Sequence, residues 1–319
     1  MTEKRPEIGQ AIKREVRQRC GFGCIFCGIP VYHYDHISEY STVKQHSAEN
    51  ITLLCGYHHD LKTRGQIPTE VVRIKNQEPV NKPQGETAPH TLFYYGNSAR
   101  IVAGGNEILT SDRSVSALKI DGHSLVDFEL VEGQLMLNMD FRDKAGEAVL
   151  TVRKNELVHS THLWDYEFVS KTLTIRERRG NIYISITFSP DKQSVILAKG
   201  LVSHNGIDVL FDARGLCILN NRTMLSGNSV RGIDTAISVG VSGPNSPPSA
   251  VHIDVSRGPY DQQEAISWAR KQMSRAKINS NATTPRIDHS MIAPGTKLTW
   301  MSIAFMPYPW ALDTCRRPR

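Results

Sequence analysis

Cysteine and histidine side chains gather in one short part of the chain. Residues 23–62 hold three of the six cysteines and five of the twelve histidines. Two pairs share a two-residue spacing, Cys24-x-x-Cys27 and Cys55-x-x-His58. Each pair offers two ligands to one metal ion, and together they complete a closed tetrahedral Cys₃His site, which is typical of structural zinc. A lone redox pair at Cys24 and Cys27 is the alternative, and it leaves the second pair without a role.

The other cysteines are predicted to bind no metal. Cys20 precedes the tight turn of the first pair and is interpreted as a spectator, and Cys217 and Cys315 are isolated and predicted to be buried free thiols. Clustered thiols in a reducing compartment act as metal ligands more often than as disulfides. The first twenty residues are charged and lack the apolar segment of a secretory signal, and no apolar run is long enough to span a membrane. We therefore predict a cytoplasmic protein without a membrane partner.

Further polar residues surround the two predicted zinc pairs at fixed spacing. After the first pair the chain reads Asp35-His36-Ile37, and around the second it reads Asn50-Ile-Thr-Leu-Leu-Cys55-Gly-Tyr-His58-His59-Asp-Leu-Lys62. In this order the segment resembles the HNH endonuclease family, the ββα-metal or His-Me finger nucleases, over about residues 8–75. Two departures are visible. His58 stands where the family usually has a fourth cysteine, and the Gly-Gly pair that often precedes the central asparagine is absent.

The resemblance implies a division of labour among four side chains. Asp35 and His59 would hold one divalent cation, Mg²⁺ or Mn²⁺, with other divalent transition ions also suited to an imidazole ligand. His36 would be the general base, because the unperturbed pKa of histidine lies close to working pH. Asn50 would brace the loop and keep that histidine oriented. Since neighbouring strand residues point to opposite faces, we expect the chain to leave ideal strand geometry at Asp35 and His36.

Basic side chains flank the motif and are the predicted phosphate contacts. The net charge of +6 and the pI near 9.0 favour polyanionic partners. Residues 1–80 hold eleven Lys and Arg against nine Asp and Glu, a balance of only +2, so this segment is not a polycationic module. The family binds DNA, with RNA as a further candidate partner here, and contacts are expected from the flanking helices. The predicted contacts are Lys13, Arg14, Arg17, Lys62 and Arg64.

The resulting hypothesis is a metal-dependent DNA endonuclease whose β-rich domain regulates or targets the cut. By analogy with finger nucleases that carry appended modules, we expect a role in restriction or phage defence. One finger has one active site and cuts one strand, so a double-strand cut would favour a homodimer. The alternative is a non-catalytic zinc-binding adaptor for nucleic acid, and the presence of Asp35, His36 and His59 argues against it.

The elements predicted around these residues give an α+β fold. A helix over residues 8–20 precedes the metal-rich segment, and residues 1–75 form a small zinc-stabilised ββα domain. Residues 76–90 contain three prolines and almost no apolar side chain, which is typical of a semi-extended linker. Residues 91–319 form a larger, mostly β domain of unassigned role, in targeting, sensing or oligomerisation.

Turn signals divide the second domain into short strands. They recur about every eight to twelve residues, which predicts a sandwich or a barrel, with a β-solenoid as the alternative. Strict alternation over residues 182–188 predicts a strand buried on one face. Asp261–Lys277 is the one convincing helix and is predicted to pack on a sheet. Hairpin turns are predicted at Arg179-Gly180, at Asn205-Gly206 and around Asp143–Gly146.

Overall fold

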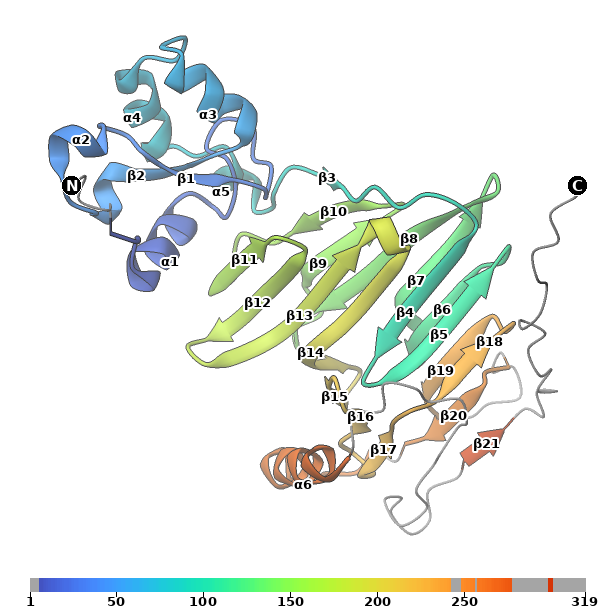
Figure 1. Ribbon diagram of the computed structural model, residues 1–319. Helices are drawn as coiled ribbons and strands as arrows, with labels where there is room; N and C mark the ends of the chain where they lie inside the picture. The colour runs from blue at the N-terminus through green and yellow to red at the C-terminus, as the bar shows by residue number, and fades with distance from the viewer. Residues whose placement is uncertain (1–5, 242–247, 256, 277–297, 301–319) are drawn as a thin grey trace, which may run out of the picture.

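The computed structural model describes residues 6–241, 248–255, 257–276 and 298–300 (Figure 1). These residues form a mixed α+β fold in which strands predominate, as predicted. A small domain with a two-stranded sheet is followed by a larger domain with two extended sheets. None of the helices within these ranges is long and apolar enough to cross a membrane. Lys277, the predicted end of the last helix, and Cys315 lie outside the described residues.

The first domain is built around an antiparallel pair of strands. Its elements are α1 (Gln10–Arg19), β1 (His33–His36), α2 (Tyr40–Val43), η1 (Ala48–Asn50), β2 (Ile51–Leu54), α3 (Gly56–Thr63) and α4 (Thr69–Gln77). Every residue of β2 is buried, and Val16 of α1 and Val72 of α4 share its apolar cluster. The predicted first helix is confirmed, and β1, β2 and α3 follow one another in the order ββα.

Residues 76–90 are not the semi-extended linker that their prolines suggested. They contain the end of α4, the short helix α5 (Asn81–Gln84) and the first residue of β3 (His90–Thr91). Asn81 is fully buried, and its side-chain amide donates to the carbonyl oxygens of Gly21 and Gly28, both at 3.0 Å. A buried amide that is hydrogen-bonded in this way fixes the segment against the first domain.

The second domain consists of two large sheets (Figure 1). The first sheet has, in spatial order, β21 (Leu298–Trp300), β20 (Val251–Asp254), β19 (Thr235–Gly240), β6 (Val115–Ile120), β7 (His123–Val131), β8 (Gln134–Arg142), β9 (Ala148–Arg153), β10 (Glu156–His159) and β3. The second has β11 (Asp165–Val169), β12 (Thr172–Arg178), β13 (Asn181–Ser189), β14 (Ser194–His204), β15 (Ile207–Asp212), β16 (Gly215–Ile218) and β17 (Thr223–Leu225). Three further strands extend from β14: β4 (Ser98–Ala103) pairs with β14, β5 (Asn106–Ser111) pairs with β4, and β18 (Ser229–Arg231) pairs with β5. The short helix η2 (Pro190–Lys192) precedes β14 in the chain.

The two sheets enclose one hydrophobic core. Phe128 and Leu137 of the first sheet and Ile186 and Phe188 of the second belong to the same buried cluster. Neither sheet closes on itself among the described strands, so the barrel alternative is wrong. Most neighbouring strands are antiparallel and consecutive in the chain, unlike the stacked coils of a solenoid. The arrangement fits the sandwich alternative.

The predicted hairpin turns are present. At Asn205-Gly206 both residues have positive φ, 48° and 75°, as a tight two-residue turn between twisted strands requires. The strand predicted over residues 182–188 also exists, but its burial does not alternate strictly. Tyr183 and Ser185 are buried as well. The Tyr183 hydroxyl donates to the carbonyl oxygen of Arg142 at 2.6 Å, and the pairing with β14 shifts in register after Ser185. The other two turns join β12 to β13 and β8 to β9.

Helix α6 (Gln262–Arg275) confirms the packed helix of the second domain. Asp261 caps it by accepting a hydrogen bond from the Glu264 amide at 2.9 Å. Its buried stripe, Ala265, Ile266, Ala269 and Met273, forms a cluster with Cys217 and Met224. Cys217 is therefore the buried free thiol that was predicted.

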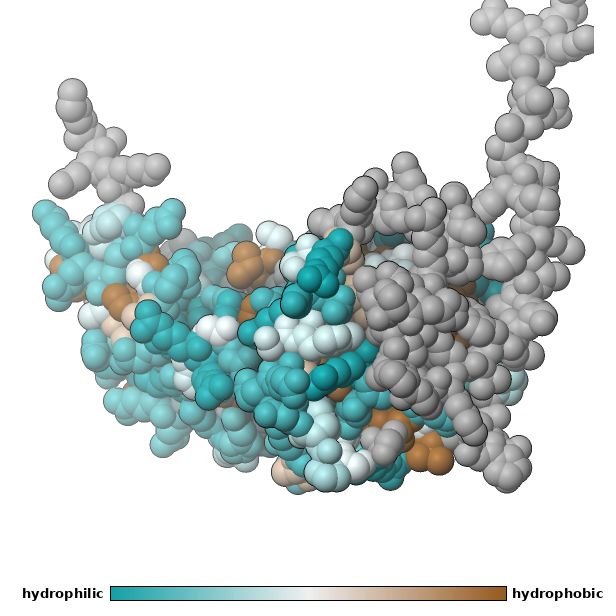
Figure 2. Space-filling model, turned by 90° about the horizontal axis from the view of Figure 1, so that it is seen from below, coloured by the Kyte–Doolittle hydropathy of each residue, from teal (hydrophilic) through white to brown (hydrophobic). Residues whose placement is uncertain are grey.

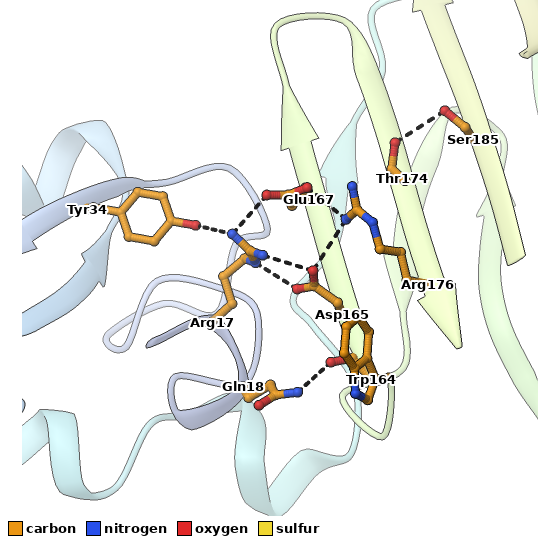
Figure 3. A network of polar contacts seen from close by, with 9 residues as sticks. All are labelled: Arg17, Gln18, Tyr34, Trp164, Asp165, Glu167, Thr174, Arg176 and Ser185. Atoms are coloured by element: carbon orange, nitrogen blue, oxygen red, sulfur yellow. Dashed lines mark hydrogen bonds and ion pairs between the residues drawn. The ribbon is translucent and has the colours of Figure 1, made fainter. Parts of the chain in front are cut away.

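A buried ion-pair network joins the two domains (Figure 3). The Arg17 guanidinium of α1 contacts both carboxylate oxygens of Asp165, at 2.8 and 2.9 Å, and Oε1 of Glu167 at 2.9 Å. It also donates to the Tyr34 hydroxyl at 2.6 Å. Arg176 of β12 reaches the same two carboxylates. Two cations thus balance two anions where the side chains of Arg17 and Asp165 are only 2% and 4% exposed.

The positive charge of Arg17 is neutralised within this ion-pair network. Burial alone would lower the pKa of the guanidinium, but its hydrogen bond to Asp165 raises the pKa above the ordinary value. The prediction that Arg17 contacts DNA phosphate is therefore wrong, because its charge is already paired inside the protein.

Aromatic contacts extend the junction. Phe22 follows α1 with a φ of 57°, is 1% exposed and belongs to the core cluster of the second domain. Its ring meets Tyr166 edge-on, with 6.4 Å between ring centroids. Arg14 lies 4.8 Å from the ring centroid of Trp164, whose carbonyl accepts a hydrogen bond from Gln18 at 2.5 Å. The domains therefore meet through a desolvated interface.

Exposed large hydrophobic side chains are few among the described residues. On the face shown in Figure 2, hydrophilic residues predominate in the described part, and the hydrophobic ones form small separate groups. The two most exposed large hydrophobic side chains among the described residues, Phe93 at 78% and Tyr95 at 72%, belong to one segment between β3 and β4.

Replacing Arg17 by alanine should destabilise the protein strongly, because the buried Asp165 and the half-buried Glu167 would keep less than their full counter-charge. We expect a loss of about 3–5 kcal/mol in the free energy of unfolding. Urea unfolding followed by tryptophan fluorescence measures it.

Arg73→Ala is the matched control, since Arg73 forms an exposed ion pair with Glu70 at 3.2 Å. That variant should lose no more than about 1 kcal/mol. Equal unfolding midpoints for the two variants would contradict the structural role of the Arg17 network.

Candidate metal centre and active site

Four ligand atoms converge at the start of the first domain. Those of Cys24, Cys27, Cys55 and His58 all lie within 4.8 Å of one another. The sulfurs of Cys27 and Cys55 are 3.7 Å apart, and Nδ1 of His58 lies 3.4 Å from the sulfur of Cys24 and 3.2 Å from that of Cys55. Tetrahedral bonds of zinc place its ligand atoms about 3.3–3.8 Å apart. The cluster can therefore hold a metal ion such as zinc, as its spacing predicted.

A hydrogen bond couples the side chains of Cys24 and Cys27. A hydrogen bond to Cys27 lowers the pKa of Cys24 to about 4, and the reciprocal bond raises the pKa of Cys27. Metal binding to cysteine requires thiolates and releases such protons. A metal ion that binds this pair would displace its remaining proton into solvent.

Two local structures deliver these ligands. In the first, a tight turn, the Gly28 amide donates to the Cys24 carbonyl at 2.8 Å. Gly28 has a φ of +75°, and a Cβ there would lie 2.1 Å from Oδ1 of Asn81. In the second, Cys55 is the N-cap of α3 and His58 lies in its first turn. The three-residue spacing brings both to one side of that helix.

Cys20 lies outside this cluster, as predicted. Its sulfur contacts Oγ1 of Thr52 at 3.8 Å and Oδ1 of Asn76 at 3.6 Å. Burial raises the pKa of this thiol, so it stays protonated and packs as a small apolar side chain.

A second set of candidate ligands, Asp35 and His59, lies beside the Cys₃His cluster. Oδ1 of Asp35, on β1, lies 3.5 Å from Nε2 of His59, on α3. His59 directly follows His58, so an ion in the Cys₃His cluster would also fix the position of His59. His33 shares a face of β1 with Asp35, and its ring lies 5.5 Å from that of His59. A carboxylate and an imidazole at this separation can bind one divalent cation.

Lys62 supplies a positive charge to this pair. Its ammonium lies 2.6 Å from Oδ2 of Asp35 and donates to the carbonyl oxygen of His36. The side chains of Lys62 and Asp35 are 13% and 14% exposed, so each compensates the charge of the other. The structure therefore places Lys62, predicted as a phosphate contact, against the candidate metal ligand.

The expected departure from strand geometry at Asp35 and His36 is wrong. Strand β1 pairs with β2 in regular register, with Asp35 opposite Thr52 and His36 opposite Ile51. The pleat directs the two side chains to opposite faces. While Asp35 faces α3, the 6% exposed His36 places Nε2 3.1 Å from Nδ1 of His46.

Asn50 holds the loop that follows His36. Its Oδ1 accepts a hydrogen bond from the Ser38 amide at 2.8 Å, and its Nδ2 donates to the Ser38 carbonyl at 3.0 Å. The Asn50 carbonyl also accepts from the Ile37 amide at 2.8 Å. These three bonds are the contacts that the bracing role requires.

The remaining basic residues have different surroundings. Lys13 lies 5.8 Å from the ring centroid of Tyr34, and Arg14 stacks on Trp164 at the domain junction. Arg64 is 67% exposed and pairs with Asp60 at 3.1 Å. Much of the basic face of α1 is thus used within the protein, and Arg64 is the one exposed residue among the five predicted phosphate contacts.

Two positioning residues escaped the sequence analysis. Asn81 braces the turn of the first cysteine pair from a segment that reads as a linker. His46 contacts His36 and, through Nε2, the carbonyl oxygen of Pro6 at 2.8 Å. Neither residue belongs to a spaced motif, so only the tertiary fold shows its contacts.

Comparisons with models of protein families, with curated proteins and with solved structures found no match. The activity of this chain must therefore be inferred from its own residues and their geometry.

Cys55→Ser should abolish metal retention, because it removes the ligand that joins the two halves of the cluster. We expect about one zinc ion per wild-type chain and a small fraction of that in the variant. Elemental analysis of purified protein measures it. Cys20→Ala is the control and should keep its zinc, and a loss as large as that of Cys55→Ser would contradict the assigned ligand set.

Gly28→Ala should destabilise the turn of the first pair through a clash with Asn81. Gly65→Ala is matched in backbone conformation, with a φ of +71° and open space around its Cβ position, and should cost about 1–2 kcal/mol. Gly28→Ala should cost about 1–3 kcal/mol more. Urea unfolding measures the free energy of unfolding of both variants. Equal losses would show that Asn81 moves away from the added Cβ without a cost in stability, which would contradict the prediction.

Proposed function

We propose that this protein is a metal-dependent endonuclease of the HNH type that hydrolyses phosphodiester bonds of DNA. The observation that carries the proposal is the 3.5 Å approach of Asp35 and His59 beside a Cys₃His cluster. The ordered motif from Cys24 to Lys62 supports it, since nearly every position of the family pattern is filled.

The chemistry requires a stabilised phosphate and an activated water. A divalent cation, when bound, supplies Lewis acidity at the phosphate oxygens and stabilises the leaving oxygen. Asp35 and His59 would hold that cation, and the Cys₃His site would keep α3 in place with its own zinc. Lys62 would contribute positive charge at Asp35 until the cation binds.

His36 is the proposed general base, and its contacts restrict its tautomer. The Pro6 carbonyl can only accept a hydrogen bond, so Nε2 of His46 carries a proton. Neutral His46 therefore accepts at Nδ1, and His36 donates from Nε2. The proposed proton acceptor is then Nδ1, the ring nitrogen that does not contact His46.

The pleat of β1 constrains where substrate can lie. Asp35 and His36 start on opposite faces, and β1 ends at His36. We infer that the scissile phosphate would lie over this end of the strand, and that the 6% exposed His36 would have to turn toward it from the opposite face. Asn50 would keep the loop beyond His36 clear of that position.

A non-catalytic adaptor for nucleic acid is the competing function, and one contact favours it. Lys62 occupies Oδ2 of Asp35, and a permanent ion pair there would leave the carboxylate unable to bind a cation. Such a protein would bind DNA through its basic residues and would bind zinc without a second divalent cation.

Incubation of the full chain with supercoiled plasmid and Mg²⁺ or Mn²⁺ should yield nicked circles. His36→Ala and His59→Ala should each reduce the rate at least about a hundredfold, because one removes the base and the other a cation ligand. His162→Ala, an exposed histidine of the second domain, is the control and should nick at the wild-type rate.

The outcome separates the two functions. Nicking that survives both substitutions would identify a contaminant and remove the nuclease proposal. Plasmid binding without nicking, together with zinc content but no Mn²⁺ binding by calorimetry, would establish the adaptor instead.

A further inference from the structure

A basic pocket lies in the second domain, on a different part of the chain from the candidate nuclease site. It has a volume of about 440 Å³, within the range of about 300–1,000 Å³ that small-molecule sites occupy. Strands β4, β5 and β18, the loop between β5 and β6 and the helix η2 supply its walls. Arg100, Arg113, Lys192 and Arg231 line it, and none of the described lining residues is acidic.

The register of the strands places two of these cations on one face. Leu109 of β5 is paired with Arg100 of β4 on one side and with Arg231 of β18 on the other. Directly paired residues share a face of a sheet, so the two arginines flank Leu109, about 10 Å apart at their backbones. A phosphate group could lie between them above an apolar floor.

Other contacts hold the rim in shape. Arg113 donates to the Gly232 carbonyl at 2.5 Å, which ties the loop between β5 and β6 to the residue that follows β18. Glu107, just outside the lining, pairs with Arg100 and reduces its net charge. Lys192 and Arg231 are exposed at the rim.

The segment between β3 and β4, which carries two exposed aromatic side chains, contacts the pocket lining through its backbone. Gln193 lines the pocket, and its Oε1 accepts a hydrogen bond from the Tyr95 amide at 3.2 Å. Leu92 and Tyr94 are buried, and the Tyr94 hydroxyl donates to the Ser194 carbonyl at 2.9 Å, so the segment is fixed in place. Phe93 and Tyr95, between and after them, are the most exposed large hydrophobic side chains described.

We propose that this pocket is a nucleotide-binding site, in which the cations hold a phosphate and Tyr95 stacks on a base. Cations next to exposed aromatic rings are the combination that binds unpaired nucleotides, because every base has a π-face and every unit a phosphate. The nucleotide is either a free molecule or one unit of a single strand. The site lies outside the nuclease motif, and its binding does not depend on the proposed cleavage.

Fluorescence anisotropy of the full chain with a labelled twelve-nucleotide single-stranded DNA, without added divalent cation, tests the site. Lys192→Ala/Arg231→Ala and Tyr95→Ala should each weaken binding at least about tenfold. Tyr95→Trp should restore it. The double variant Arg178→Ala/Arg179→Ala removes two exposed charges from the β12–β13 hairpin and should bind as wild type.

Competition identifies the source of the nucleotide. Displacement by adenosine monophosphate, but not by inorganic phosphate, supports a free nucleotide, and displacement by unlabelled strand alone supports a nucleic acid. His36→Ala should bind as wild type, so failure of the nuclease proposal leaves this result intact. Equal binding by both double variants, displacement by inorganic phosphate as strong as by the nucleotide, or no binding by wild type would overturn the proposal.

Discussion

The Cys₃His cluster is the constraint on which the candidate active site depends. It ties the turn at Cys24 to the first turn of α3, and that helix carries His59 and Lys62 toward β1. The helix has only eight residues and no buried side chain among them, so its own packing can hold it only weakly. A metal ion shared by four ligands would supply the missing restraint. The geometry at Asp35 therefore follows from sulfur and imidazole ligands that take no part in the chemistry.

The second constraint is the buried junction between the domains. Arg17 connects Asp165 and Glu167 of the second domain with Tyr34, the residue next to Asp35 in β1. Oppositely charged groups that leave water together are stable only with good geometry, and here two arginines and two carboxylates satisfy one another. The strand that carries the candidate metal ligand is thus held on one face by the other domain.

Much of the site follows from the sequence because its signals are short-range. The candidate zinc ligands form two pairs of fixed spacing. The hairpin turn at Asn205-Gly206 is set by the conformation of its own two residues, and the apolar stripe of α6 can be read from its sequence. The contacts of two other residues cannot be read in this way. Arg17 meets a partner 148 positions away, and Asn81 acts through the backbone of Gly21 and Gly28. The regular pairing of β1 likewise depends on β2, whose register no spacing rule supplies.

Phe22 has a practical consequence for dissecting the molecule. Its ring lies within the interior of the larger domain, while its backbone leads directly into the cysteine turn. A fragment ending near residue 75 would present that ring to water, leave Arg17 without Asp165 and omit Asn81. The first domain therefore depends on contacts with the second, and a cut near residue 75 would remove part of its support.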